Sequence, residues 1–131
     1  MSDYLFAYGT LQAAYAAEEI RPLMARLRSM GEASVRGVLY DLGDYPGAVL
    51  DPSSASKVFG TVFELPDCEE TLAELDRYEE FDPNARADSL FVRVREPVAL
   101  QSGEVAMSWI YVYQRNPGGA PIIESGRYGT R

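Results

Sequence analysis

Glu79 is the residue best placed in this sequence to move a proton. It comes three and four residues after Asp76 and Leu75 in a stretch of helical periodicity, so it can share the inward face of that helix. Burial beside tyrosine rings would disfavour the ionised carboxylate and bring its pKa toward neutral pH, where proton transfer is most useful. Two alternatives stand beside this hypothesis: Glu80 competes for the same role, and an acid at a helix end is often simply solvated.

Residues 4–11, with the sequence YLFAYGTL, are a candidate binding site for a carboxylate or carbonyl oxygen. Their apolar first half predicts a buried strand, after which Gly9 lets the backbone turn with a positive φ or approach another group closely. The pattern becomes helical after Leu11, so the turn would leave backbone N–H groups unpaired and pointing in one direction, where Thr10 adds a hydroxyl. A single glycine is a weak signal, and an ordinary strand-to-helix turn is the alternative.

The types of side chain that are missing limit the chemistry further. The chain has no histidine, which removes Ser-His-Asp and Cys-His catalysis together with the commonest zinc ligand. Cys68 stands between two acids that disfavour its thiolate, and Lys57, the only lysine, lies in a polar loop, so a carboxylate or a tyrosine must handle protons. The tyrosines that could add a hydroxyl to a pocket are Tyr8, Tyr40, Tyr45, Tyr111 and Tyr113. Each alone carries little weight, because most buried tyrosines fill space and satisfy one hydrogen bond.

Length and composition predict one globular domain over residues 1–131. The chain has 131 residues, 47% of them hydrophobic, which is enough to build a core. Its net charge of -8 argues against a nucleic-acid partner, and no basic amphipathic or long apolar segment suggests a membrane. The N-terminus lacks the basic and apolar regions of a signal peptide, and a lone cysteine fits a reducing compartment, so we expect a cytoplasmic protein.

Hydrophobic periodicity predicts an α+β protein in which strands outnumber helices. The predicted helices are residues 12–30, interrupted at Pro22, and residues 66–80; after the first strand, the predicted strands are residues 33–42, 48–50, 58–65, 90–100 and 105–113. Residues 35–42 and 58–65 each place a glycine before an apolar run, and we expect them to be neighbouring strands that bend or approach each other closely at glycine. The strands connect mostly as meanders, which predicts a strongly curved, barrel-like sheet with two main helices.

The order of motifs along the chain resembles the gamma-glutamylcyclotransferase-like family. Residues 8–11 (YGTL) after an apolar strand are similar to the family's substrate loop, and residues 75–79 (LDRYE) to its helix-end motif. Further similar segments are residues 37–42 (GVLYDL), 45–47 (YPG), 60–65 (GTVFEL), 109–113 (WIYVY) and 125–126 (SG). Together these segments cover nearly the whole chain in the family's order.

The resemblance implies an α+β fold with a small, mixed, strongly curved β-barrel and two main flanking helices. It also implies that Glu79 rather than Glu80 is the catalytic acid and base. The implied substrate-binding residues are Tyr8, Gly9, Thr10, Leu11 and Tyr111. The implied reaction is the cyclisation of a γ-glutamyl amine or γ-glutamyl amino acid to 5-oxoproline with release of the free amine. This reaction needs no metal and no organic cofactor.

Two positions depart from the family's pattern. Many relatives have glycine where this chain has Glu80, a second acid that either raises the pKa of Glu79 by repulsion or points into water. Residues 125–128 read Ser-Gly-Arg-Tyr where bacterial relatives usually have Ser-Gly-Asp-Trp, which leaves the identity of the leaving amine open.

Two other functions are compatible with the sequence: a non-catalytic module of the same fold that binds a small carboxylate, and a structural or interaction domain. The sequence does not give the oligomeric state.

Overall fold

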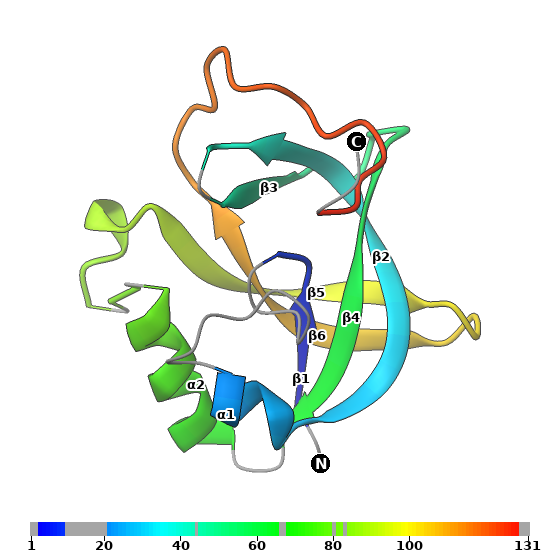
Figure 1. Ribbon diagram of the computed structural model, residues 1–131, viewed down its shortest axis with the longest axis vertical. Helices are drawn as coiled ribbons and strands as arrows, with labels where there is room; N and C mark the ends of the chain where they lie inside the picture. The colour runs from blue at the N-terminus through cyan, green and yellow to red at the C-terminus, as the bar shows by residue number, and fades with distance from the viewer. Residues whose placement is uncertain are drawn as a thin grey trace.

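The computed structural model describes residues 3–9, 21–43, 45–65, 68–79, 81–82 and 84–128 (Figure 1). In chain order, its strands and helices are β1 (Asp3–Ala7), α1 (Arg21–Ala25), β2 (Arg28–Asp41), β3 (Pro46–Leu50), β4 (Lys57–Leu65), α2 (Cys68–Tyr78), β5 (Phe91–Leu100) and β6 (Val105–Tyr113), with a short 3-10 helix at Arg86–Asp88 before β5. Both helices lie together on one side of the barrel, and β3 lies at the opposite end with the C-terminal segment (Figure 1).

Five strands close into a barrel. Hydrogen-bonded neighbours follow the order β2, β4, β1, β6 and β5, and β5 then pairs back onto β2, where Ala33 lies opposite Leu100. The pairing of β1 with β6 is parallel and the other pairings are antiparallel, so the sheet is mixed. Strand β3 adds to β2 outside this ring. The predicted α+β class, with a small, mixed and strongly curved barrel flanked by two helices, is confirmed.

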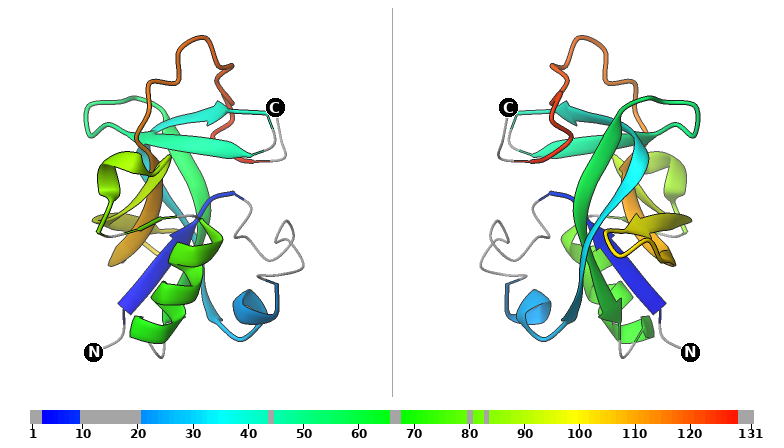
Figure 2. Two further views of the ribbon diagram at one scale, coloured as in Figure 1. Left: turned by 90° about the vertical axis from the view of Figure 1, so that its left-hand side faces the viewer. Right: turned by 90° about the vertical axis from the view of Figure 1, so that its right-hand side faces the viewer.

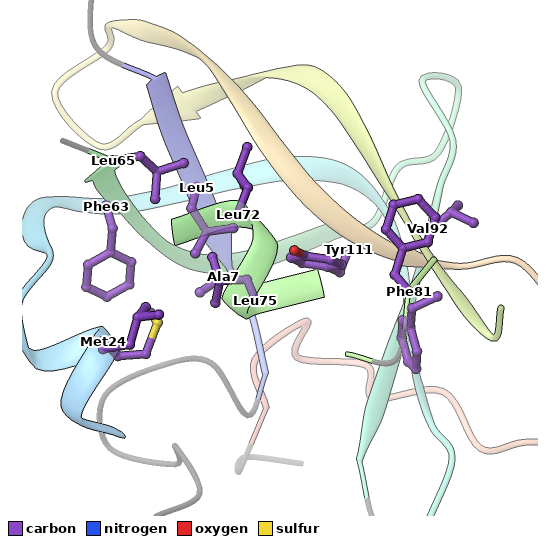
Figure 3. Close-up of a cluster of buried hydrophobic side chains, with 12 residues drawn as sticks. Leu5, Ala7, Met24, Phe63, Leu65, Leu72, Leu75, Phe81, Val92 and Tyr111 are labelled. Carbon is purple, nitrogen blue, oxygen red and sulfur yellow. The ribbon is translucent and has the colours of Figure 1, made fainter. Parts of the chain in front are cut away.

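Alternation of side chains along the strands builds two apolar layers. The first layer fills the barrel interior, and its buried members include Phe6, Leu39, Val58, Val62, Val98 and Ile110. The second layer lies between the outer face of the barrel and the two helices, and it includes Leu5, Ala7, Met24, Phe63, Leu65, Leu72, Leu75 and Tyr111 (Figure 3). Burial of one large aliphatic or aromatic side chain contributes about 1.5–3 kcal/mol, so the second layer anchors α2 to the barrel.

The predicted helix over residues 12–30 is wrong at its C-terminal end. Residues 12–20 lie outside the described residues, α1 is only five residues long, and β2 already begins at Arg28. Arg28 pairs with Glu64 of β4, and a bulge follows before Gly31, whose φ of 113° suits glycine. Backbone pairing with β4 therefore outweighs the helical spacing of the apolar residues in this stretch.

The other predicted helix and strands end within two residues of α2, β3, β4, β5 and β6. The two strands with similar sequences, β2 and β4, do run side by side (Figure 2). Their glycines, however, are approached closely by other strands. A Cβ atom at Gly37 would lie 2.6 Å from the Val49 carbonyl oxygen of β3, and one at Gly60 would lie 2.2 Å from the Ala7 carbonyl oxygen of β1.

The C-terminal segment, residues 114–128, packs along the barrel through backbone hydrogen bonds. The Ile123 N–H donates to the Leu39 carbonyl of β2 at 2.8 Å, and the Phe59 N–H of β4 donates to the Gly126 carbonyl at 2.8 Å. The segment therefore supplies backbone partners to both strands at the end of the barrel that lies away from the helices (Figure 1).

Candidate active site

Glu79 directly follows the last residue of α2. The helix is amphipathic: Leu72 and Leu75 face the barrel, and acids occupy the first turn, where the helix dipole favours them. The Glu79 N–H still donates to the Leu75 carbonyl at 2.9 Å, and the Phe81 N–H donates to the Asp76 carbonyl at 2.8 Å. Hydrogen bonds on both sides therefore fix the backbone that carries Glu79.

The Glu79 side chain is half-buried. Burial raises the pKa of its carboxyl from the ordinary value of 4.5 to about 7, because the ionised form loses solvation. The C-terminal end of a helix offers a carboxylate no positive partial charge in compensation. At neutral pH the group is therefore balanced between its acid and base forms, which is the condition for moving a proton in both directions.

Tyr8 and Gly9 form a buried bend at the end of β1. The Tyr8 hydroxyl donates to the Tyr111 carbonyl at 2.5 Å and accepts from the Ala48 N–H at 3.2 Å, so it fastens the bend to β6 and β3. A Cβ atom at Gly9 would lie 2.6 Å from Cγ of Pro46. Gly9 was expected either to turn with a positive φ or to be approached closely by another group, and the structure shows the close approach.

Glu79 lies close enough to this bend to act on it electrostatically. Burial raises the pKa of the Tyr8 phenol, and the Glu79 charge raises it further. Burial also raises the pKa of Tyr111, with smaller upward contributions from Asp76 and from Glu79. Glu79 therefore lies within electrostatic range of Tyr8, the neighbour of Gly9, and of Tyr111, although these residues come from three distant parts of the sequence. Thr10 and Leu11 lie outside the described residues, as does Glu80.

The sequence did not predict a network of hydrogen bonds around Asp76, three residues before Glu79. Asp76 accepts two hydrogen bonds from the Arg93 guanidinium, from Nε at 2.8 Å and from Nη2 at 3.0 Å, and a third from the Tyr111 hydroxyl at 2.6 Å. The Arg93 guanidinium stacks on Trp109, 4.3 Å from the ring. The sequence carried no specific signal for this network, because Arg93 is one of three charged residues, with Arg95 and Glu96, in the predicted strand over residues 90–100.

Two other candidate tyrosines pack on Phe91: Tyr45 meets it edge-on at 5.6 Å between ring centroids, and Tyr113 lies 5.5 Å from it. The backbone of Tyr40 pairs with Ile122 in an isolated bridge. Among the residues that the structure describes, no three potential metal ligands gather into a site. In the same part of the chain, no helix has the length and apolar character needed to cross a membrane.

Residues 5–130 match the protein family described as "Gamma-glutamyl cyclotransferase, AIG2-like". A relative from Citrobacter rodentium, named "Gamma-glutamylcyclotransferase family protein ytfP", is 33% identical over 128 residues, which are 97% of this chain and 96% of that protein. The protein of the same name from Escherichia coli K12 is 32% identical over 128 residues, with the same coverage of 97% and 96%.

Solved structures agree with these matches. The solution structure of ytfP from Escherichia coli has a TM-score of 0.62 at 31% identity and covers 95% of this chain and 95% of its own. The crystal structure of an AIG2-like protein from Mus musculus has a TM-score of 0.74 at 20% identity, over 95% of this chain and 87% of the mouse chain, which supports the fold alone. The chain belongs to the gamma-glutamyl cyclotransferase, AIG2-like family.

Proposed function

We propose that this protein is a γ-glutamyl cyclotransferase that uses Glu79 as its general acid and base. The observation that carries the proposal is the half-buried Glu79 carboxyl, whose pKa burial raises to about 7 and whose charge acts on the Tyr8 phenol in the buried bend. A solvated acid at a helix end would have neither the raised pKa nor the neighbouring bend.

The substrate would be a γ-glutamyl amine or γ-glutamyl amino acid. Its α-amino nitrogen attacks its own γ-carbonyl carbon, so the new C–N bond closes a five-membered ring and the C–N bond to the leaving amine breaks. The α-ammonium loses two protons in becoming the ring N–H. Glu79 takes these protons one after the other and passes both to the departing nitrogen, so the products are 5-oxoproline and a protonated amine. No water is consumed, and no second reactant is required.

The fold's contribution would be mainly positional. Holding the α-amine against the γ-carbonyl can supply roughly 7 kcal/mol or more in a well-oriented intramolecular reaction. We assign the substrate's carboxylate or carbonyl oxygen to backbone N–H groups of residues 8–11. The Tyr8 hydroxyl already has two protein partners, so Tyr8 would act through its backbone and ring.

Tyr111 would lie in the floor of the same site. Its hydroxyl proton is donated to Asp76 at 2.6 Å, so this oxygen keeps only acceptor capacity. The residue is also only 2% exposed, so Tyr111 would support the floor of the site and would not itself hold a substrate group.

Release of 5-oxoproline from γ-glutamyl amines, γ-glutamyl amino acids and ε-(γ-glutamyl)lysine tests the proposal. Glu79→Gln should lower kcat by about 10²–10⁴, the usual range for removing a general acid or base. Glu74→Gln is the matched control, because it removes an acid from the same helix whose side chain is 50% exposed. Full activity of Glu79→Gln would remove Glu79 as the base. A wild-type protein without turnover on the whole panel, yet stabilised against heat by a carboxylate ligand, would instead support the non-catalytic binding module.

A further inference from the structure

Tyr111 connects the two parts of the candidate site. Its hydroxyl donates to Asp76 of α2 at 2.6 Å, and its backbone carbonyl accepts from the Tyr8 hydroxyl at 2.5 Å. The residue is only 2% exposed, and Figure 3 shows its ring in the apolar layer with the hydroxyl directed toward α2. Tyr111 therefore binds the end of α2 through its hydroxyl and the bend at the end of β1 through its backbone carbonyl.

Arg93 holds this connection in place. It lies on β5 directly opposite Tyr111 of β6 and binds both carboxylate oxygens of Asp76, with 15% of the Arg93 side chain and 10% of the Asp76 side chain exposed. Two-point pairing of a guanidinium with a carboxylate fixes direction as well as distance. The stacking of the guanidinium on Trp109 leaves it little freedom to move.

Asp76 braces the turn that carries Glu79. The two residues are three positions apart, so they share one face of the helix end. The Asp76 side chain is tied to the barrel, while its backbone carbonyl accepts from the Phe81 N–H at 2.8 Å, beyond Glu79 in the chain. A shift of Asp76 would therefore move Glu79 directly.

We propose that Asp76, Arg93 and Tyr111 are positioning residues that hold the Glu79 carboxyl at a set distance from the bend of Tyr8 and Gly9. This role rests on the proposed function, since it concerns the acid that would move the proton. None of the three is a catalytic residue in this account, because each acts through Glu79. The network consists of side chains on three separate elements, α2, β5 and β6, so it also fixes how the helix end sits on the barrel.

Tyr111→Phe is the sharpest test, because it removes a single oxygen from a buried ring. A misplacement of about 1 Å can cost roughly 10²-fold in rate, so we expect kcat to fall about 10- to 100-fold while KM changes less than about threefold. Asp76→Asn should lower kcat similarly, and the double variant should be hardly worse than either single variant, as for residues that act as a unit. Asp3→Asn is the matched control: it breaks the Arg95–Asp3 ion pair of 3.1 Å, which joins β5 to β1 and not to α2, and it should leave kcat unchanged.

A second measurement tests the positioning role independently of whether the protein is a cyclotransferase. The Glu79 carboxyl can be titrated by NMR in the folded protein without any substrate. In Tyr111→Phe, a loosened helix end should let water reach the carboxyl, so its titration midpoint should fall by about 1 pH unit or more toward the ordinary value. A folded Tyr111→Phe variant with an unchanged midpoint, or with wild-type kcat, would overturn the positioning role. A wild type without turnover would overturn the proposed function, and the titration would still decide the positioning.

Discussion

Burial of the Glu79 carboxyl should make the stability of the fold depend on pH, and Glu79→Gln should remove that dependence. Burial raises the pKa of Glu79 from its ordinary value of 4.5 to about 7, so the folded protein holds this proton more tightly than the unfolded chain does. A carboxyl of this kind stabilises the fold fully below about pH 4.5, and the contribution is lost as the pH rises through about 7.

The expected magnitude follows from the interval between the two pKa values. Each pH unit corresponds to ~1.4 kcal/mol, which gives an upper value of about 3 kcal/mol for the interval from 4.5 to about 7. The Glu79 side chain is only half-buried, and water screens part of the penalty. We therefore expect the wild type to lose about 2 kcal/mol relative to Glu79→Gln between pH 5 and pH 8.5.

Urea unfolding measures this difference through the fluorescence of Trp109, the chain's single tryptophan. At pH 5 the free energies of unfolding of the wild type and Glu79→Gln should agree within about 1 kcal/mol, since the carboxyl is then still protonated in the folded wild type. At pH 8.5 the variant should be the more stable protein by about 2–3 kcal/mol. The other carboxyl groups are present in both proteins and cancel in the comparison. Glu74→Gln, which changes a half-exposed side chain, should stay within about 0.5 kcal/mol of the wild type at both pH values.

A difference between the wild type and Glu79→Gln that does not change with pH would refute the reasoning. It would mean that water solvates the Glu79 carboxylate as well in the folded protein as in the unfolded chain. The physical basis for choosing Glu79 as the acid and base would then be gone, even if the fold is correct.

Three substitutions test the packing around the site, each through the melting temperature. Gly60→Ala places a methyl group 2.2 Å from the Ala7 carbonyl oxygen, so it should destabilise the fold by about 2 kcal/mol or more and lower activity by moving the end of β1. Gly126→Ala combines a φ of 72° with a Cβ atom 2.0 Å from the Lys57 carbonyl oxygen, so it should destabilise by about 2–3 kcal/mol with little change in kcat. Leu75→Ala empties a position that is 0% exposed between α2 and the barrel, and it should cost about 2–5 kcal/mol. At about 3–5 °C per kcal/mol, an unchanged melting temperature would contradict any of the three.

Local patterns in the sequence predict most of the barrel. The strand over residues 105–113 and the hairpin turn before it follow from alternation and from Gly103, whose φ is 98°. The early start of β2 could not be predicted in this way. Arg28 is held in a strand by pairing with Glu64, and a partner 36 positions away in the sequence leaves no trace in the local spacing of apolar residues.

In the candidate site, too, the features set by local sequence could be predicted and those set by distant contacts could not. Glu79 was predicted from its spacing on an amphipathic helix and from the family's helix-end motif. The partners of Asp76 were not, because Arg93 and Tyr111 are 17 and 35 positions away. Their meeting depends on the register of β5 against β6 and on how α2 packs on that pair. Sequence alone could not distinguish Arg93 from Arg95 and Glu96 in the same strand, and it could not name the carboxylate that Arg93 binds.

The acid limb of the pH–rate profile tests whether the buried Glu79 carboxyl is the group that accepts the proton. In the free enzyme, kcat/KM should rise with pH through about 7, the pKa to which burial raises Glu79, because only the ionised carboxylate can accept a proton. A substrate ammonium beside Glu79 replaces part of the lost solvation and lowers this pKa, so the acid limb of kcat should lie at lower pH than that of kcat/KM. An acid limb of kcat/KM near 4.5, the ordinary value for a glutamate, would assign proton transfer to a solvated acid instead. Separation of the two limbs would show that the substrate ionises the group that acts on it, and that the penalty for burying Glu79 is offset when the substrate binds.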